Sequence, residues 1–254
     1  MLRKLLFLSL STLFLLGNVD QVVGQDAEEP IWETILLVPD NTKLKVLGEN
    51  MKKHNQKYHK EGPYSASVYN ITTGPDTGKM VWIMGPLKYS HLDARPAAGG
   101  HDEDWRDNIM PYIKKTQQGE YWEGDVELSN TAMTAGDPSA FPILFTRYWE
   151  INPGKGFGVE RHFKMVSETI KAMEGEHPWG IYFNEFQQGN IGRHIATVSF
   201  HKSWTDFEKP WKFRESFDKV HGASAWNAFT RNREATFENV WDEIWVYNKE
   251  LSGD

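Results

Sequence analysis

The stretch from Lys88 to Asp107 carries several side chains that could do acid–base chemistry. It places Tyr89 and His91 close to carboxylates, around the small-residue centre Ala97-Ala-Gly-Gly100. A histidine beside a carboxylate can act as a general base, because the carboxylate fixes its tautomer. We name His91 and Tyr89 as candidate catalytic residues, since both follow directly on a predicted strand. The alternative is a solvated loop in which Asp102-Glu-Asp104 forms the acidic first turn of a helix.

Glu33 and Arg147 form a second candidate pair. Each lies in a predicted strand that ends in a proline-led turn, and aligning Pro39 with Pro153 places Glu33 opposite Arg147. One interpretation is an ion pair that fixes the relative placement of two parts of the chain. The other makes Arg147 a catalytic residue that clamps an anion or carboxylate in a pocket, with Glu33 as a ligand-binding residue. Solvent exposure of both is the third possibility.

The histidines do not show a metal-binding pattern. None of the nine lies in a His-Glu-x-x-His motif or a similarly tight spacing. His54 and His59 are five residues apart on a predicted helix, which puts them about 140° apart around its axis. We therefore expect no metal site, although ligands gathered from distant segments remain open. His194, at the start of a predicted strand, is kept as a candidate ligand-binding residue.

Tryptophan is abundant, with eleven residues in the chain. Trp122 and Trp241 occupy comparable places at the start of two predicted strands, which favours a role in the core. Trp82 and Trp149 have no such counterpart, so we name them as candidate pocket residues that could stack on a planar ring. Ordinary core packing is the alternative for both. The chain also lacks a Ser-His-Asp spacing, a P-loop and a dinucleotide-binding glycine motif.

The composition excludes several classes of protein. Of 254 residues, 39% are hydrophobic and 25% charged, the net charge is −7, and there is no cysteine. These fractions are typical of a globular protein, and the absence of a basic block argues against nucleic acid as a partner. Without cysteine there is no disulfide, thiolate nucleophile or cysteine-ligated metal.

The first 24 residues have the layout of a secretory signal peptide. Arg3 and Lys4 precede an apolar run from Leu5 to Leu16, and Val22-Val23-Gly24 offers small residues before a cut. We therefore expect a secreted or periplasmic protein that contacts no membrane once the signal is removed. An uncleaved N-terminal anchor is the alternative.

The remaining chain contains one pattern of elements twice, about 115 residues apart. Each copy has a strand, a helix, a β-hairpin, a second helical stretch and a last strand. The paired segments are the hairpins at Tyr64–Met84 and Trp179–Val198, the second helical stretches at Trp105–Lys115 and Trp204–Arg233, and the last strands at Tyr121–Leu128 and Val240–Tyr247. We predict a first repeat over residues 25–130, a linker over residues 131–142 and a second repeat over residues 143–254.

This order of elements is the β-α-β-β-α-β unit of the ferredoxin-like fold. Each unit has helices on only one face of its sheet, so the other face must be buried. We therefore predict an α+β protein in which two fused ferredoxin-like repeats pack sheet to sheet as a single-chain dimeric α/β barrel. Two independent domains are the alternative.

The segment Arg147-Tyr-Trp-Glu-Ile-Asn-Pro-Gly-Lys155 resembles a pattern of the dimeric α/β-barrel superfamily. It is most similar to NIPSNAP-like and antibiotic-biosynthesis-monooxygenase-like domains, which have an arginine, an aromatic residue two positions on, and Pro-Gly-Lys before the first helix. The first repeat departs from it, with Glu33 at the position of the arginine. The resemblance implies the fold, and it implies several activities, because members include cofactor-free monooxygenases, isomerising enzymes and haem proteins.

These observations lead to a functional expectation. We expect a pocket for a small, largely apolar organic molecule, in an enzyme of the cofactor-free monooxygenase type or a related one that needs no bound cofactor. The alternative is a non-catalytic ligand-binding or protein-interaction module, and a homo-oligomer is possible in either case. A haem protein is the third hypothesis, and it needs an axial histidine in a pocket.

Overall fold

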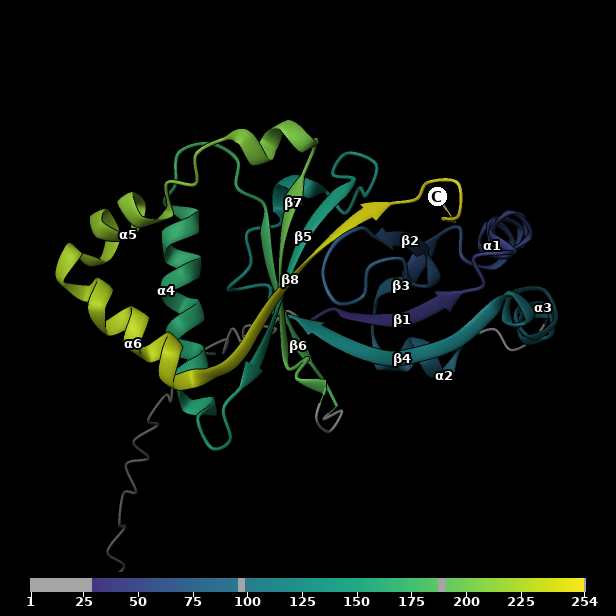
Figure 1. Ribbon diagram of the computed structural model, residues 1–254, viewed down its shortest axis with the longest axis horizontal. Helices are drawn as coiled ribbons and strands as arrows, with labels where there is room; N and C mark the ends of the chain where they lie inside the picture. The colour runs from purple at the N-terminus through teal and green to yellow at the C-terminus, as the bar shows by residue number, and fades with distance from the viewer. Residues whose placement is uncertain (1–28, 96–98, 187–190, 254) are drawn as a thin grey trace, which may run out of the picture.

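The chain folds into one closed barrel with helices on its outside (Figure 1). The computed structural model describes residues 29–95, 99–186 and 191–253. The predicted signal peptide therefore lies outside the described residues. No helix among the described residues is both long and apolar enough to cross a membrane.

Within the described residues, eight strands form the barrel and six α-helices lie around it. The strands are β1 (Ile31–Pro39), β2 (Ala66–Ile71), β3 (Met80–Leu87), β4 (Ile113–Gly124), β5 (Ile143–Ile151), β6 (Trp179–Asn184), β7 (Ile195–His201) and β8 (Phe237–Tyr247). The helices are α1 (Leu44–Tyr58), α2 (Tyr89–Asp93), α3 (His101–Asp104), α4 (Val159–Lys171), α5 (Phe213–His221) and α6 (Trp226–Thr236).

All strand pairs are antiparallel, and the order around the barrel is β1-β3-β2-β8-β5-β7-β6-β4. The first four strands follow the order β4-β1-β3-β2, and the last four follow the same order, β8-β5-β7-β6. Hydrogen bonds from β2 to β8 and from β4 to β6 join the two sets along their edges. The two sheets therefore face each other across a shared interior, with α4, α5 and α6 on one side and α1 and α3 on the other (Figure 1).

Side chains alternate between the interior and the helices. On β5, Leu144 and Tyr148 belong to the hydrophobic cluster inside the barrel, whereas Trp149 packs against α4 in a separate cluster. On β1, Leu36 belongs to the interior cluster and Leu37 to the cluster beneath α1. This period of two gives each sheet two apolar faces, one toward the helices and one toward the opposite sheet.

The second helical stretch of the first half is shorter than the sequence predicts. After α3, a π-helical turn over Trp105–Ile109 and a short 3-10 turn lead into β4, which begins at Ile113 rather than Tyr121. The extra strand residues pair with the end of β1, where the register shifts between Leu36 and Leu37. Residues 113–120 therefore form backbone hydrogen bonds with β1 instead of continuing as a helix.

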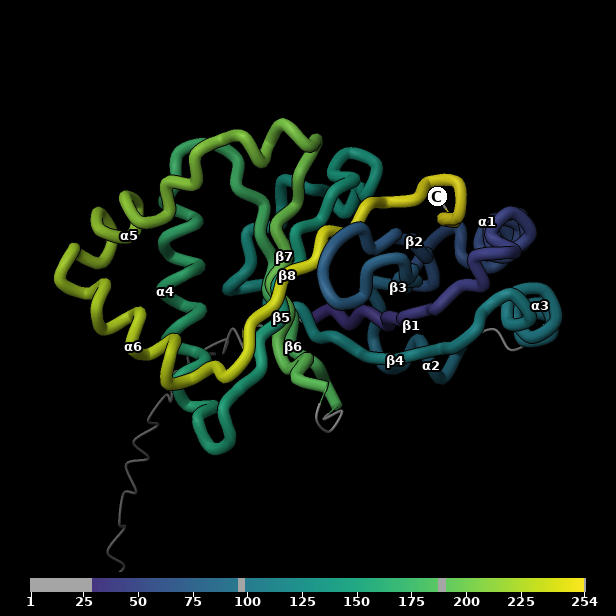
Figure 2. Tube along the Cα trace, viewed as in Figure 1, coloured from purple at the N-terminus to yellow at the C-terminus, as the bar shows by residue number. Residues whose placement is uncertain are grey.

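The last residues of the chain pack against the first half (Figure 2). The Asn55 side-chain amide donates to the Leu251 carbonyl at 2.6 Å, and the Gly253 amide donates to the Ala66 carbonyl at 2.9 Å. The Val68 amide donates to the Ser252 hydroxyl at 2.9 Å. These contacts tie the segment after β8 to α1 and β2, next to the seam that β8 forms with β2.

Two glycines on β4 provide a test of barrel closure. A Cβ atom at Gly124, in the β4–β6 seam, would lie 2.5 Å from the Trp32 ring and 3.3 Å from Tyr182, whereas one at Gly119 would have no atom within 4 Å. We expect Gly124→Ala to lower the free energy of unfolding by about 1–3 kcal/mol through overpacking. The matched Gly119→Ala should leave it within about 0.5 kcal/mol.

Urea unfolding followed by tryptophan fluorescence measures both effects. Equal stability of the two variants would contradict the close packing of the Trp32 and Tyr182 rings on Gly124.

Candidate functional site

The barrel interior contains a cavity with a volume of about 390 Å³. Such a volume suits a small organic molecule. Aromatic rings make up much of its wall, and most of its polar groups are hydroxyls. The residues concerned include Trp32, Tyr69, Trp122, Phe141, Tyr148, Tyr182, Phe200 and Trp245 among the aromatic ones, and Thr34, Ser67, Thr134 and Thr146 among those with hydroxyls.

The segment between the two halves forms part of the cavity wall. Residues Thr131 to Phe141, predicted as a linker, contribute eight of the lining residues, including Thr134, Asp137 and Pro138. The segment contains a short 3-10 turn over Ala132–Thr134 and is held by turn hydrogen bonds of Thr134 and Asp137. This connection therefore covers the cavity as well as joining the halves.

A buried cluster of charged side chains shares Tyr148 with the cavity wall. The Arg193 side chain is only 5% exposed, and its Nη2 donates to Tyr148 Oη at 2.6 Å and lies 3.2 Å from Glu120 Oε2. Its Nη1 donates to Asp76 Oδ2 at 3.3 Å, and Lys79 pairs with the same carboxyl group. The guanidinium also lies over the Tyr148 ring, 4.0 Å from its centre.

The charges in this cluster leave one carboxyl group in surplus. Two cations, Arg193 and Lys79, face Asp76, Glu120 and Glu243. Glu243 is fully buried, and burial raises its pKa to about 7, an increase that nearby Arg193 partly offsets. Burial also raises the pKa of Glu120, against the opposing effect of Arg193. Glu243 therefore gains and loses a proton near neutral pH.

The two halves place the same residue types at matching positions of the barrel. The sequence Glu-x-Trp occurs on β4 (Glu120–Trp122) and on β8 (Glu243–Trp245). Each glutamate lies opposite a threonine of the first strand of its half, Thr34 or Thr146. Trp122 donates to the Thr34 hydroxyl at 3.2 Å, whereas Trp245 donates to Glu243 Oε2 at 2.8 Å. The halves therefore share a Thr–Glu–Trp arrangement but differ in which of its residues accepts the tryptophan hydrogen bond.

Several buried polar atoms of this region have no hydrogen-bond partner. Among the described residues they include Gln118 Oε1, Thr146 Oγ1, Arg193 Nε and Glu243 Oε1. Thr146 lines the cavity and lies opposite Glu243 in the β5–β8 ladder. Because buried polar groups are nearly always paired, these atoms indicate a place for water or for a polar group of a ligand.

Tyr148 can offer a hydrogen bond to such a ligand. Burial raises the pKa of Tyr148 well above its usual value, so the phenol keeps its proton. Its oxygen accepts the hydrogen bond from Arg193, which leaves the phenolic hydrogen for another acceptor. The cavity thus combines apolar walls with one hydroxyl donor polarised by a guanidinium. The Glu243 carboxyl group, which titrates near pH 7, lies buried behind this wall, opposite Thr146.

The expected pair between Glu33 and Arg147 does not form. Glu33 accepts hydrogen bonds from Arg95 at 3.1 and 3.3 Å, whereas Arg147 makes two hydrogen bonds, of 2.6 and 2.8 Å, to Asp242 on β8. Both side chains point away from the interior, on strands that are far apart in the barrel order. The alignment of Pro39 with Pro153 is wrong for these strands. The β1–β4 and β5–β8 pairings instead make Thr34 the counterpart of Thr146. Arg147 therefore does not clamp an anion in the cavity.

Tyr89 and His91 lie together but outside the cavity wall. Both belong to the short helix α2 rather than to a loop. The Tyr89 side chain is exposed, and its hydroxyl donates to Glu185 at 2.8 Å. His91 Nδ1 accepts a hydrogen bond from the Lys88 amide, which ties the ring to its own helix. Neither residue reaches the cavity, since the chain turns away from the barrel after β3.

Trp82, Trp149 and His194 also lie outside the cavity wall. Trp82 and Trp149 belong to the outer hydrophobic clusters, where their ring nitrogens donate to Asn55 and Thr197. His194 precedes β7, and its Nδ1 accepts a hydrogen bond from the Ile151 amide. Both tryptophans occupy outward positions of their strands. The alternation of side chains along a strand shows which residues share a face, but only the register shows which face points inward.

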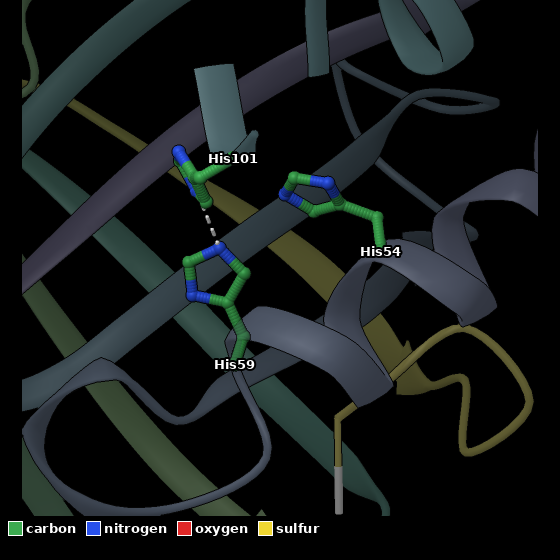
Figure 3. A group of neighbouring side chains, drawn as sticks. All are labelled: His54, His59 and His101. Atoms are coloured by element: carbon green, nitrogen blue, oxygen red, sulfur yellow. Dashed lines mark hydrogen bonds between the residues drawn. The ribbon is translucent and has the colours of Figure 1, made fainter. Parts of the chain in front are cut away.

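Three histidines come together on the outer side of the first half. His54, His59 and His101 each have a ring nitrogen within 4.8 Å of the others (Figure 3). The prediction that His54 and His59 diverge is wrong, because α1 ends at Tyr58. His59 has left the helix, with φ −131° and ψ 34°, and its ring can turn back.

Solved structures with the same fold include proteins whose names suggest enzymes. A candidate monooxygenase from Fusobacterium nucleatum matches with a TM-score of 0.54 and 9% identity, over 87% of this chain and 93% of that one. An anthrone oxidase-like protein matches with a TM-score of 0.53 and 13% identity, over 89% and 94%. A candidate chlorite dismutase matches with a TM-score of 0.51 and 9% identity, over 89% and 97%.

The chain thus has a ferredoxin-like, dimeric α/β-barrel type of fold, as the sequence predicts. No sequence profile of a protein family matches the chain. No curated protein matches it either. The likeness therefore establishes the fold, and the function has to come from the site.

The haem hypothesis finds no support in this cavity. It needs an axial histidine, and no histidine is among the described residues that line the cavity. The residues present instead suit an organic molecule held by aromatic contacts and a few hydrogen bonds.

The raised pKa of Glu243 predicts a pH-dependent stability. The folded protein holds the Glu243 proton up to about pH 7, whereas the unfolded chain releases it near pH 4.5. The proton therefore makes its full contribution to the free energy of unfolding below pH 4.5, and this contribution is lost as the pH rises through 7. The loss is on the order of 3 kcal/mol. Urea unfolding of wild type and Glu243→Gln between pH 5 and 9 measures it.

The glutamine variant should lack this decline, since it has no proton to lose. A wild-type slope that persists unchanged in Glu243→Gln would contradict the assignment.

Proposed function

We propose that the barrel cavity binds a small, largely apolar, flat organic molecule and that the protein is a cofactor-free monooxygenase or a related enzyme. The observation that carries this proposal is the juxtaposition of Thr146, Tyr148 and Glu243. Thr146 and Tyr148 place an unpaired hydroxyl and a polarised phenol in the wall of an aromatic cavity. Glu243, with a pKa of about 7, lies buried directly opposite Thr146. The names of the monooxygenase and the anthrone oxidase-like protein support the same class of reaction.

The proposed chemistry begins with a proton transfer. A ketone with an acidic, conjugated methylene group, or its phenol tautomer, binds with its oxygen at Tyr148. Buried Glu243, in its carboxylate form, accepts the acidic proton through a water molecule beside the unpaired Thr146 hydroxyl. The resulting anion is stabilised by the Tyr148 hydroxyl, which Arg193 polarises. A base whose pKa lies near the working pH is suited to this step.

Dioxygen is the second substrate in this proposal. In a monooxygenase without a cofactor, the organic substrate itself supplies both electrons. A methylene group then becomes a carbonyl that contains one oxygen atom of dioxygen, and the two hydrogens leave with the other oxygen atom as water. The chain has only to bind, orient and deprotonate the substrate, and to exclude bulk water.

The organisation of the chain follows from the same account. We propose that residues 25–130 and 143–254 are two fused ferredoxin-like units and that residues 131–142 form both their linker and part of the cavity wall. Export under direction of residues 1–24, to the periplasm or the exterior, and self-association remain proposals. Both halves line the cavity, so neither unit has the site alone.

Binding can be tested with anthrone as the probe. We expect it to quench tryptophan fluorescence in a saturable way, because Trp32, Trp122 and Trp245 line the cavity. Ala196→Phe, which fills part of the cavity, should weaken binding at least tenfold. The matched Ala223→Phe, at an exposed position before α6, should bind as wild type does.

Turnover can be tested with an oxygen electrode. We expect anthrone-dependent oxygen consumption above the uncatalysed rate, and Glu243→Gln should lower it about 100-fold or more while leaving anthrone affinity within threefold. Saturable anthrone binding without oxygen consumption would indicate a non-catalytic binding protein and contradict the proposed monooxygenase activity. Absence of binding, or equal binding by Ala196→Phe, would contradict the site itself.

A further inference from the structure

The three histidines outside the barrel have the arrangement of a metal site. His54 comes from α1, His59 from the residue just after α1, and His101 from the first turn of α3, and the three rings face a common space (Figure 3). His59 Nε2 and His101 Nε2 are 3.0 Å apart. Two nitrogens bound to one Zn²⁺ at about 2.05 Å in tetrahedral geometry lie about 3.3 Å apart, so this spacing needs only a small adjustment.

The outer nitrogen of each ring is held by an acceptor. His54 Nδ1 donates to Asp104 Oδ2 at 2.7 Å, and His101 Nδ1 donates to Asp102 Oδ1 at 2.7 Å. His59 Nδ1 donates to the Tyr64 carbonyl at 2.8 Å. Carboxylates and carbonyls only accept hydrogen bonds, so all three protons are on Nδ1. The three Nε2 lone pairs of the neutral rings therefore remain for an ion.

Buried ring nitrogens without a hydrogen-bond partner destabilise the folded protein unless a ligand binds between them. The His54 side chain is fully buried, yet its Nε2 has no hydrogen-bond partner. A shared proton between His59 and His101 would satisfy that pair but would still leave His54 unpaired. One cation satisfies all three nitrogens at once. Histidine ligands of metals commonly donate their other ring nitrogen to a carboxylate or carbonyl, which is what Asp104, Asp102 and Tyr64 provide.

We propose that His54, His59 and His101 bind one divalent transition-metal ion of the kind that imidazole suits, such as Zn²⁺ or Co²⁺. The three ligands leave a fourth position for water or an exogenous ligand. The ion joins the end of α1 to α3 and lies beside the rings of Trp82 and Trp105. The site lies on the helix-covered side of the first sheet, so it is separate from the barrel cavity and independent of the function proposed for it.

Metal binding can be measured on the full chain after treatment with a chelator. We expect Co²⁺ to bind once per chain and to give visible absorption bands of a nitrogen-ligated site. Zn²⁺ should displace it and, at a hundred times its dissociation constant, raise the melting temperature by about 5 °C or more. His54→Gln, His59→Gln and His101→Gln should each weaken binding at least 100-fold. The control His177→Gln, in the second half, should leave it unchanged.

Two further readouts cover the case in which a histidine variant fails to fold. Asp104→Asn keeps all three ligands and should weaken binding 10- to 100-fold, since it loosens the His54 ring. In wild type, ¹⁵N spectra should show Nδ1-protonated tautomers for the three rings and a shift of their Nε2 signals on addition of Zn²⁺. No saturable binding below about 10 µM, or binding that survives all three substitutions, would overturn the proposal.

Discussion

The constraint on which this structure depends is that neither four-stranded sheet can expose its inner face to water. Each sheet has helices on one side only, and its other side carries large apolar groups such as Leu36, Trp122, Leu144 and Trp245. Closing the two sheets into one barrel buries both inner faces and leaves no free strand edge. The cavity follows from this closure, because residues from both halves meet in the interior without filling it.

Burial of the interior also controls its electrostatics. A guanidinium inside a barrel is tolerated only with charged or polar partners, and Arg193 has Glu120, Asp76 and Tyr148 around it. Since Lys79 also pairs with Asp76, the remaining carboxyl group, Glu243, is neutral at acidic pH and titrates near pH 7. The chemistry proposed for the cavity thus arises from how the fold balances buried charge. The histidine cluster is another polar site, on the opposite side of the first sheet.

The sequence allowed the class of fold and the order of elements to be predicted, because strand alternation and helical periodicity are local signals. It did not allow the site to be predicted. The chemistry of four residues makes them candidates, but their strand positions point outward: Glu33, Trp82, Arg147 and Trp149. Successive side chains of a strand point to opposite faces, so an alignment error of one residue reverses which side chains are expected inside the barrel.

A usable signal was nevertheless present in the sequence. The motif Glu-x-Trp recurs in both last strands, at Glu120 and Glu243, and it identifies the matching positions of these two strands. His101 lies in the stretch from Lys88 to Asp107, and its approach to His54 and His59 depends on where α1 ends. That contact joins residues about 40 positions apart, so spacing alone could not reveal it.

A crystal structure of the protein grown with anthrone tests the central claim most directly. The account predicts ring-shaped electron density inside the closed barrel, between Trp32, Trp122 and Trp245, with the ligand oxygen within hydrogen-bond distance of Tyr148. Density for the ligand only at the outer surface, or an interior filled by side chains with no room for the rings, would contradict it.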